Sequence, residues 1–205
     1  MAFASLADYA PLIHLTIEAI LTETIAADTS RNDLLKIAVG GFVSGLLTPL
    51  LPDLIDLLTG APRMLRLALL ALPFAVVVFF VVRRRSANPP WAALVAAIVT
   101  MVAFVGAVNA AIFIDGQMTG AAKPMRSLFA GLTGGLVGAG LMALGIARLP
   151  ASPRNAAAWM PMLVTGALAG SLLALDTSLG LDRTSFLYPA WQAAVGVRLA
   201  LVLRR

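Results

Sequence analysis

Long uninterrupted runs of apolar residues dominate the pattern along this chain. A helix rises about 1.5 Å per residue, so about 20 apolar residues match the roughly 30 Å hydrocarbon core of a bilayer. The run at residues 125–147 meets this requirement and carries no charge after Arg126. We expect a membrane-spanning helix in each such run, at residues 64–82, 91–114, 125–147, 156–175 and 186–203.

The segment at residues 34–58 is less regular. Its uncharged run, residues 37–51, covers about 15 residues, which is short for a full crossing. Pro49 and Pro52 lie where the helix would have to continue, and proline removes a helical hydrogen bond. Two alternatives stay open. The segment either spans the membrane by continuing to residue 58, or it is a broken or re-entrant helix whose freed backbone groups are covered by protein or a water-filled cavity.

Residues 1–33 follow a different pattern. Apolar positions recur at helical spacing, with polar and acidic residues largely between them, which predicts an amphipathic helix and a polar linker. Half of the 10 acidic residues of the chain lie in this stretch. Helices on a membrane surface usually present lysine and arginine to anionic lipid. The acidic composition therefore favours docking on the chain's own bundle or on a partner over a place at the lipid interface or a true crossing.

The composition supports membrane insertion. Hydrophobic residues make up 60% and charged residues only 12% of the chain, whereas soluble domains have about 25% charged residues. The mean hydropathy is +0.92. We therefore predict an all-α integral membrane protein, with an amphipathic N-terminal helix and one polytopic domain at residues 34–205 that forms a bundle of five or six transmembrane helices.

Basic residues set the predicted orientation, because short cytoplasmic loops are enriched in them. Arg83–Arg85, Arg148 with Arg154, and Arg204 with Arg205 fall on one side of the membrane, and fewer basic residues fall on the other. We therefore place the C-terminus in the cytoplasm. The excess of arginine over lysine and the abundance of alanine indicate a GC-rich bacterial source, and hence the bacterial inner membrane. The net charge of +5 lies at segment ends, so no nucleic-acid partner is expected.

The residues needed for several kinds of chemistry are missing. The chain has no cysteine and one histidine, which excludes disulfides, thiolate ligands and histidine clusters within one chain. The GxSxG, Walker, dinucleotide-binding and HExxH patterns do not occur. We accordingly expect no catalytic residue, no cofactor and no metal site.

Glycines recur with spacings that suit close helix packing. In a bilayer, small residues four apart let two helix backbones approach each other. This pattern predicts tight contacts, within the bundle or with a protein partner or second copy of the chain, at Gly41, Gly45, Gly131, Gly135, Gly138, Gly166 and Gly170.

A few polar residues are candidates for a pathway or a ligand site. The acids Asp53, Asp56, Asp115 and Asp176 map to the predicted external side, where they could attract cations. The alternative is that they serve as ordinary helix caps and turn residues. Asn109 lies within an apolar run, and a buried amide there would need hydrogen-bond partners.

Two functions from different classes follow. The first is a transporter or channel component for a small solute or cation. The second is a non-catalytic membrane subunit that assembles, stabilises or regulates a larger complex. A polar cavity that reaches the middle of the bundle would favour transport, whereas a dry core with an outer face suited to another protein would favour the subunit.

Overall fold

The computed structural model describes residues 30–59, 62–181 and 185–204, and every regular element in these residues is helical. The predicted amphipathic helix falls almost entirely on residues 1–29, which lie outside the described residues. The chain divides into two compact units, residues 1–36 and residues 37–205. The second unit holds the helices described below, except for the first part of the first helix, residues 30–36.

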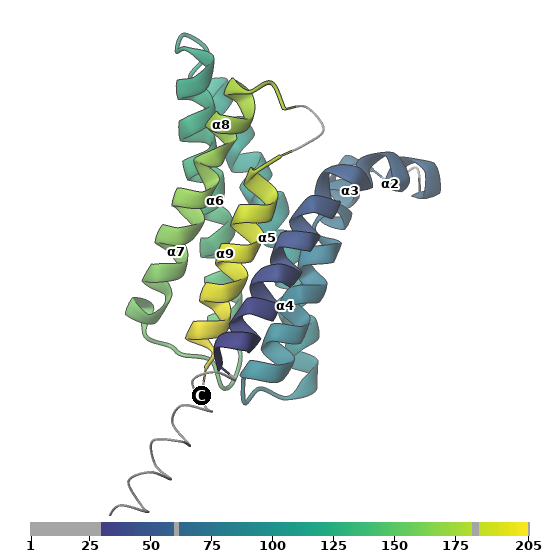
Figure 1. Cartoon of the computed structure of the whole chain (residues 1–205), viewed down its shortest axis with the longest axis vertical. Coiled ribbons are helices and arrows are strands. Elements are labelled where there is room, and N and C mark those ends of the chain that lie inside the picture. Colours follow the sequence, from purple (N-terminus) through teal and green to yellow (C-terminus); the bar gives the residue numbers. More distant parts are fainter. Residues whose placement is uncertain (1–29, 60–61, 182–184, 205) are drawn as a thin grey trace, which may run out of the picture. The chain divides into compact units, whose positions relative to one another are not determined.

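The described chain begins with a helix over residues 30–47, which continues as the 3-10 turn η1 (Thr48–Leu50) and then as α2 (Leu51–Thr59). Pro49 and Pro52 lie where α-helical hydrogen bonding gives way to the 3-10 turn, as expected for residues that lack an N–H. Ser30–Leu58 is long and apolar enough to cross a membrane. Figure 1 shows α2 turned away from the direction of the preceding helix.

The run predicted at residues 64–82 forms two helices, α3 (Arg63–Leu70) and α4 (Leu72–Arg85), bent by 54° with respect to each other. The break is at Ala71, two residues before Pro73. A proline ring clashes with the carbonyl four residues earlier and cannot donate to it, so the helix cannot run straight through this point.

The other predicted runs form α5, α6, α7, α8 and α9 in chain order. Pro90 and Pro124 lie in the first turns of α5 and α6, where the missing proline N–H costs nothing. Asn155 caps α7 by accepting a hydrogen bond from the backbone N–H of Ala157 at 3.0 Å. The bounds are Pro90–Gln117, Lys123–Ala147, Ala156–Gly170, Leu172–Ser178 and Leu187–Val202.

Four described helices are long and apolar enough to cross a membrane, and the bent pair α3 and α4 makes five if it counts as one span. The sequence predicted five or six. The difference rests on α9, whose 16 residues span only about 24 Å.

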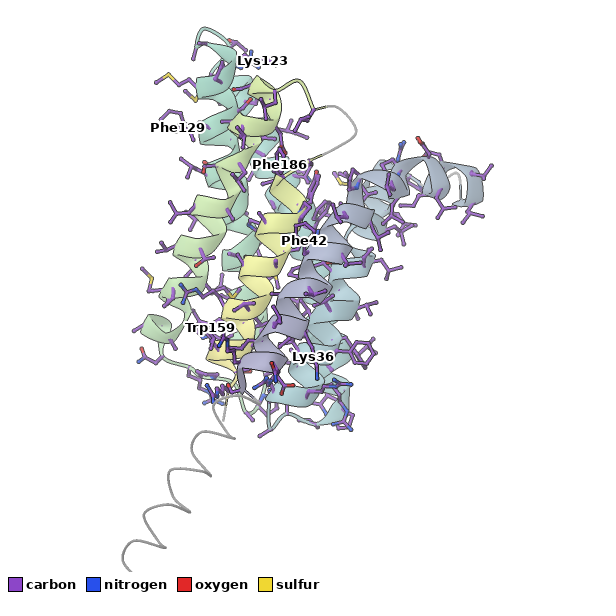
Figure 2. All side chains as sticks on the ribbon, viewed as in Figure 1. Lys36, Phe42, Lys123, Phe129, Trp159 and Phe186 are labelled. Atoms are coloured by element: carbon purple, nitrogen blue, oxygen red, sulfur yellow. The ribbon has the colours of Figure 1, made fainter. Side chains whose placement is uncertain are left out.

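Helix α6 is the centre of the bundle. Half of its most apolar window is buried, against 22–28% in the other candidate spans, and it packs against α5, α7 and α8. The outer surface is instead rich in exposed large apolar side chains such as Leu144, Val102 and Leu168. Such a surface is suited to lipid rather than to water. Figure 2 shows Lys123 and Trp159 at opposite ends of the bundle.

Candidate functional site

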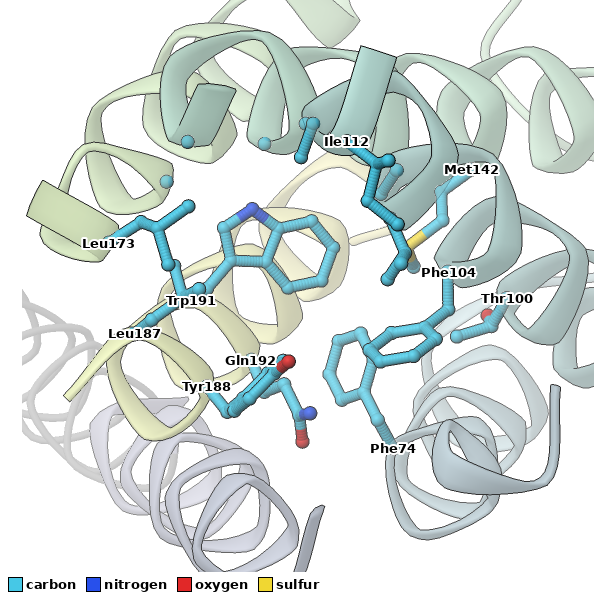
Figure 3. A pocket seen from close by; sticks show the side chains of 17 residues that line it. Phe74, Thr100, Phe104, Ile112, Met142, Leu173, Leu187, Tyr188, Trp191 and Gln192 are labelled. Atoms are coloured by element: carbon cyan, nitrogen blue, oxygen red, sulfur yellow. The ribbon is translucent and has the colours of Figure 1, made fainter. Parts of the chain in front are cut away.

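A cavity of about 180 Å³ lies in the bundle between α4, α5, α6, α8 and α9, and the last residue of α7, Gly170, also lines it. Its walls are almost entirely apolar. The rings of Phe74, Phe104, Tyr188 and Trp191 are directed toward the same space, whereas the Gln192 amide beside them is turned away from the rings (Figure 3). The other lining residues include Thr100, Ala107, Val108, Ala111, Ile112, Gly131, Gly134, Gly135, Met142, Gly170, Leu173 and Leu187.

The aromatic side chains hold one another in place. The ring centroids of Phe74 and Trp191 are 5.8 Å apart in an edge-to-face arrangement, and those of Phe104 and Tyr188 are 6.1 Å apart. The Trp191 indole N–H donates to the carbonyl of Gly166 at 3.1 Å, which fixes the ring against α7. The aromatic walls thus connect α9 with α4, α5 and α7.

The cavity extends along a substantial part of the bundle. On α5 its lining runs from Thr100 to Ile112, which corresponds to about 18 Å along the helix axis. Thr100 is almost fully buried, whereas Ile112 is 51% exposed. The cavity lining thus extends along α5 from a buried residue to a half-exposed one.

Gln192 is one of the few polar residues that line the cavity. Its side-chain oxygen accepts a hydrogen bond from the Ser44 hydroxyl at 2.6 Å, and its amide nitrogen donates to the Thr48 hydroxyl at 3.0 Å. All three side chains are at most 4% exposed. The amide therefore joins the helix over residues 30–47 and the start of η1 to α9, and one of its two N–H groups is used by Thr48. The sequence analysis did not single out Gln192.

The glycines of α6 and α7 lie directly opposite one another. A Cβ atom at Gly131 or Gly135 would come within 3.0 Å of the backbone of Gly170 or Gly166, and the reverse holds for Gly166 and Gly170. The two spaced pairs thus face each other across one interface. Gly138 instead lies against Ala107 of α5 and the Trp191 ring.

Gly41 and Gly45 form a second close contact, on α9. A Cβ at Gly41 would lie 2.7 Å from the Cα of Ala193, and one at Gly45 would clash with the backbone at Pro189. This close approach brings Ser44 and Thr48 within hydrogen-bonding distance of Gln192.

The predicted acidic candidates do not line the cavity. Asp115 forms a two-point ion pair with Arg126, at 3.1 Å and 2.5 Å, and Asp56 pairs with Arg66 at 2.6 Å. Asp53 is exposed on α2. The structure thus distributes these carboxylates over separate helix ends and does not gather them into one site.

Asp176 is buried, with only 5% of its surface exposed, and its side chain binds groups at the start of α9. It accepts hydrogen bonds from the Ser185 hydroxyl and from the backbone N–H groups of Phe186 and Leu187. These are first-turn donors without partners inside the helix, so Asp176 acts as a cap supplied from α8.

Asn109 is exposed on α5 and is not part of the cavity lining, although Val108 next to it is. Its amide nitrogen donates to the carbonyl of Val105 at 2.7 Å. Asn109 is a candidate for an internal path by its sequence position, but the structure places it on the exposed side of α5.

Within the described residues, no group of three or more histidine, cysteine or acidic side chains could hold a metal ion. Comparison of the chain with protein-family models, with curated proteins and with solved structures finds no match. The cavity and its polar groups are thus the basis for any functional conclusion.

Proposed function

We propose that this chain is a polytopic protein of the bacterial inner membrane that binds and transports a small uncharged solute in the cavity at its centre. The cavity is the observation that carries the proposal. An engineered cavity of about 150 Å³ lined by aliphatic and aromatic groups is large enough for benzene. At about 180 Å³, this one has room for a molecule built on a single ring.

The lining favours an uncharged solute over a cation. Moving an unpaired charge into an apolar cavity is unfavourable. No carboxylate of the described residues lines the cavity, and Asp56 and Asp115 are each paired with an arginine away from the lining. The Gln192 amide and the Tyr188 hydroxyl can provide hydrogen bonds to one polar group. The solute class is therefore a small apolar ring or chain with one uncharged polar end.

The first test measures occupancy of the cavity. Equilibrium dialysis of radiolabelled benzamide is carried out against the full chain in nanodiscs. Val108 lines the cavity, so Val108→Phe should fill part of it and weaken binding at least about fivefold, because overpacking typically costs about 1–3 kcal/mol. Val102→Phe is the matched control, since Val102 is 60% exposed on the outside of the same helix. Equal affinity in the two variants would contradict the proposal.

The second test separates solute from cation transport. The protein is reconstituted in vesicles, and uptake of benzamide and of a monovalent cation is measured against protein-free vesicles. The Asp53→Asn/Asp56→Asn double variant should leave benzamide uptake unchanged, because neither residue lines the cavity. Cation uptake that depends on these two aspartates would reject an uncharged solute.

Asn109 favours the alternative function, a non-catalytic subunit of a larger membrane complex. By helical spacing it shares a face of α5 with Val102 and Phe113, which are 60% and 63% exposed. An amide facing lipid is costly, and a neighbouring transmembrane helix can satisfy it. If this face binds another protein, Asn109→Leu should release a co-purifying chain while Gln117→Leu at the end of α5 does not. Retention of the partner by Asn109→Leu would reject this face.

A further inference from the structure

A second hollow lies on the outside of the bundle, between the C-terminal part of α6 and the first half of α7. It is a groove of about 610 Å³. Gly140, Ala143 and Ala147 form its floor on α6, and Trp159 and Leu163 contribute from α7. A Cβ at Gly140 would meet only the Leu163 side chain, at 3.5 Å. The groove is therefore open because small residues line it, and its walls are apolar.

Two arginines stand at the end of this groove. Arg148 follows α6 and Arg154 precedes α7, and both line the groove. Both side chains are exposed. The described residues provide no carboxylate that forms an ion pair with either guanidinium. An apolar channel that ends in two positive charges has the polarity of a phospholipid, with a hydrocarbon tail and an anionic head.

The loop that carries these arginines is held in place by neighbouring groups. The Asn88 side chain accepts a hydrogen bond from the backbone N–H of Ala151 at 2.8 Å and donates to the Ser152 hydroxyl at 3.3 Å. The Trp159 indole donates to the carbonyl of Pro153 at 2.9 Å. The arginines thus flank a loop that is hydrogen-bonded to Asn88, in the connection between α4 and α5, and to Trp159 of α7.

We propose that this groove binds one anionic phospholipid, with an acyl chain between α6 and α7 and its phosphate between Arg148 and Arg154. Guanidinium groups bind phosphate oxygens through paired hydrogen bonds. Exposed arginines alone would bind free phosphate weakly, because salt screens such contacts. The apolar groove supplies the additional contact that a free anion cannot use, so the occupant is a lipid.

The test measures which lipid stays on the protein. The full chain is reconstituted in vesicles with equal amounts of phosphatidylglycerol and phosphatidylcholine, extracted gently, and analysed by native mass spectrometry. The wild type should retain phosphatidylglycerol preferentially. Arg148→Gln/Arg154→Gln should reduce that preference by roughly 30-fold, as expected for two charge contacts with an anionic headgroup. An unchanged preference would overturn the proposal.

Control variants separate the groove from general surface charge. Arg83→Gln/Arg84→Gln removes the same charge from the exposed end of α4, outside the groove, and should keep the preference. Equal losses in both double variants would show nonspecific attraction and overturn the site.

The acyl-chain part of the proposal has its own test. Gly140→Leu should fill the groove and reduce lipid retention, whereas Gly116→Leu adds the same side chain at a position with no described atom within 4 Å of its Cβ and should not. Full retention by Gly140→Leu would overturn the assigned acyl position. A thermal stabilisation by inorganic phosphate equal to that by phosphatidylglycerol would show an anion site only and would also overturn the proposal.

Discussion

Gln192 connects two helices that are far apart in the chain, and its effect on stability can be predicted. Gln192→Leu keeps the approximate size of the side chain but removes both hydrogen bonds to Ser44 and Thr48. In the variant the Ser44 hydroxyl can donate to the Gly41 carbonyl, which lies 2.8 Å away, and the Thr48 hydroxyl still donates to the Ser44 carbonyl at 3.1 Å. Neither hydroxyl is therefore left without a partner. We therefore expect a loss of about 1 kcal/mol in the free energy of unfolding, close to what single interhelical hydrogen bonds contribute in membranes.

Unfolding by SDS in mixed micelles measures this loss. Gln117→Leu at the exposed end of α5 is the control and should change stability by less than about 0.5 kcal/mol. If both variants unfold at the same SDS fraction as the wild type, the buried amide does not hold α9 in place.

Asp176 gives a second prediction at the level of one residue. Its carboxylate caps α9 through one hydroxyl and two backbone N–H groups. Asp176→Ala should therefore lower the free energy of unfolding by about 1–2 kcal/mol, whereas Asp176→Asn keeps an acceptor and should lose less. SDS titration measures the stability, and benzamide uptake of the folded variants measures function. Loss of uptake without loss of stability would show that Asp176 acts in a pathway and not as a cap.

The interface between α6 and α7 leads to a prediction at the scale of whole elements. Replacing a helical glycine with alanine normally favours the helix by roughly 0.5–1 kcal/mol. At Gly135 the added methyl would lie within 3.0 Å of the Gly166 backbone, which cannot move unless the helices separate. Overpacking of this kind costs about 1–3 kcal/mol, so it outweighs the gain in helix propensity.

Gly135→Ala should consequently be less stable than the wild type in SDS titration. Gly116→Ala, with no described atom within 4 Å of its Cβ, should be unchanged or slightly more stable. A Gly135→Ala protein as stable as Gly116→Ala would mean that the two helices do not approach as closely as the structure shows.

The elements themselves were the part of the fold that the sequence predicted well. Residues 91–114 and 125–147 were expected as helices, and α5 and α6 extend these ranges by only a few residues. Length and lack of charge suffice here, because a helix in lipid must satisfy its own backbone. The 54° bend before Pro73 adds a change of direction whose size depends on the packing of α3 and α4.

The cavity was not predicted, because its residues come from helices distant in sequence. Gln192 and Ser44 are 148 positions apart, and no local spacing indicates that they meet. The acidic candidates illustrate the opposite case. A carboxylate near a helix end has the same sequence pattern whether it attracts a solute or caps a helix, and only the three-dimensional contacts of Asp176 distinguish the two.

On the scale of the whole molecule, charge separates the two ends of the bundle. At one end, Arg83–Arg85 and Arg204 line a polar hollow together with Asn88. Asn88 also binds the loop between α6 and α7, which carries Arg148 and Arg154. The opposite end has mixed charge, because Asp115 pairs there with Arg126. The positive-inside rule therefore predicts that the first end faces the cytoplasm. The half-exposed Ile112 lies at the end of the cavity lining toward the second end, so under this orientation we expect a solute to enter or leave from outside the cytoplasm.

The number of crossings depends on α9. Its 16 residues cover about 24 Å, less than the roughly 30 Å hydrocarbon core, but arginines at its C-terminal end can extend to the interface and the bilayer can thin locally. We therefore predict that α9 crosses the membrane. The chain has no cysteine, so a single introduced thiol reports its own side. Arg204→Cys and Ala87→Cys should react with a membrane-impermeant maleimide only from the cytoplasm, and Ser178→Cys and Thr119→Cys only from outside. Reaction of Ser178→Cys and Arg204→Cys from the same side would place α9 within one leaflet and remove the crossing.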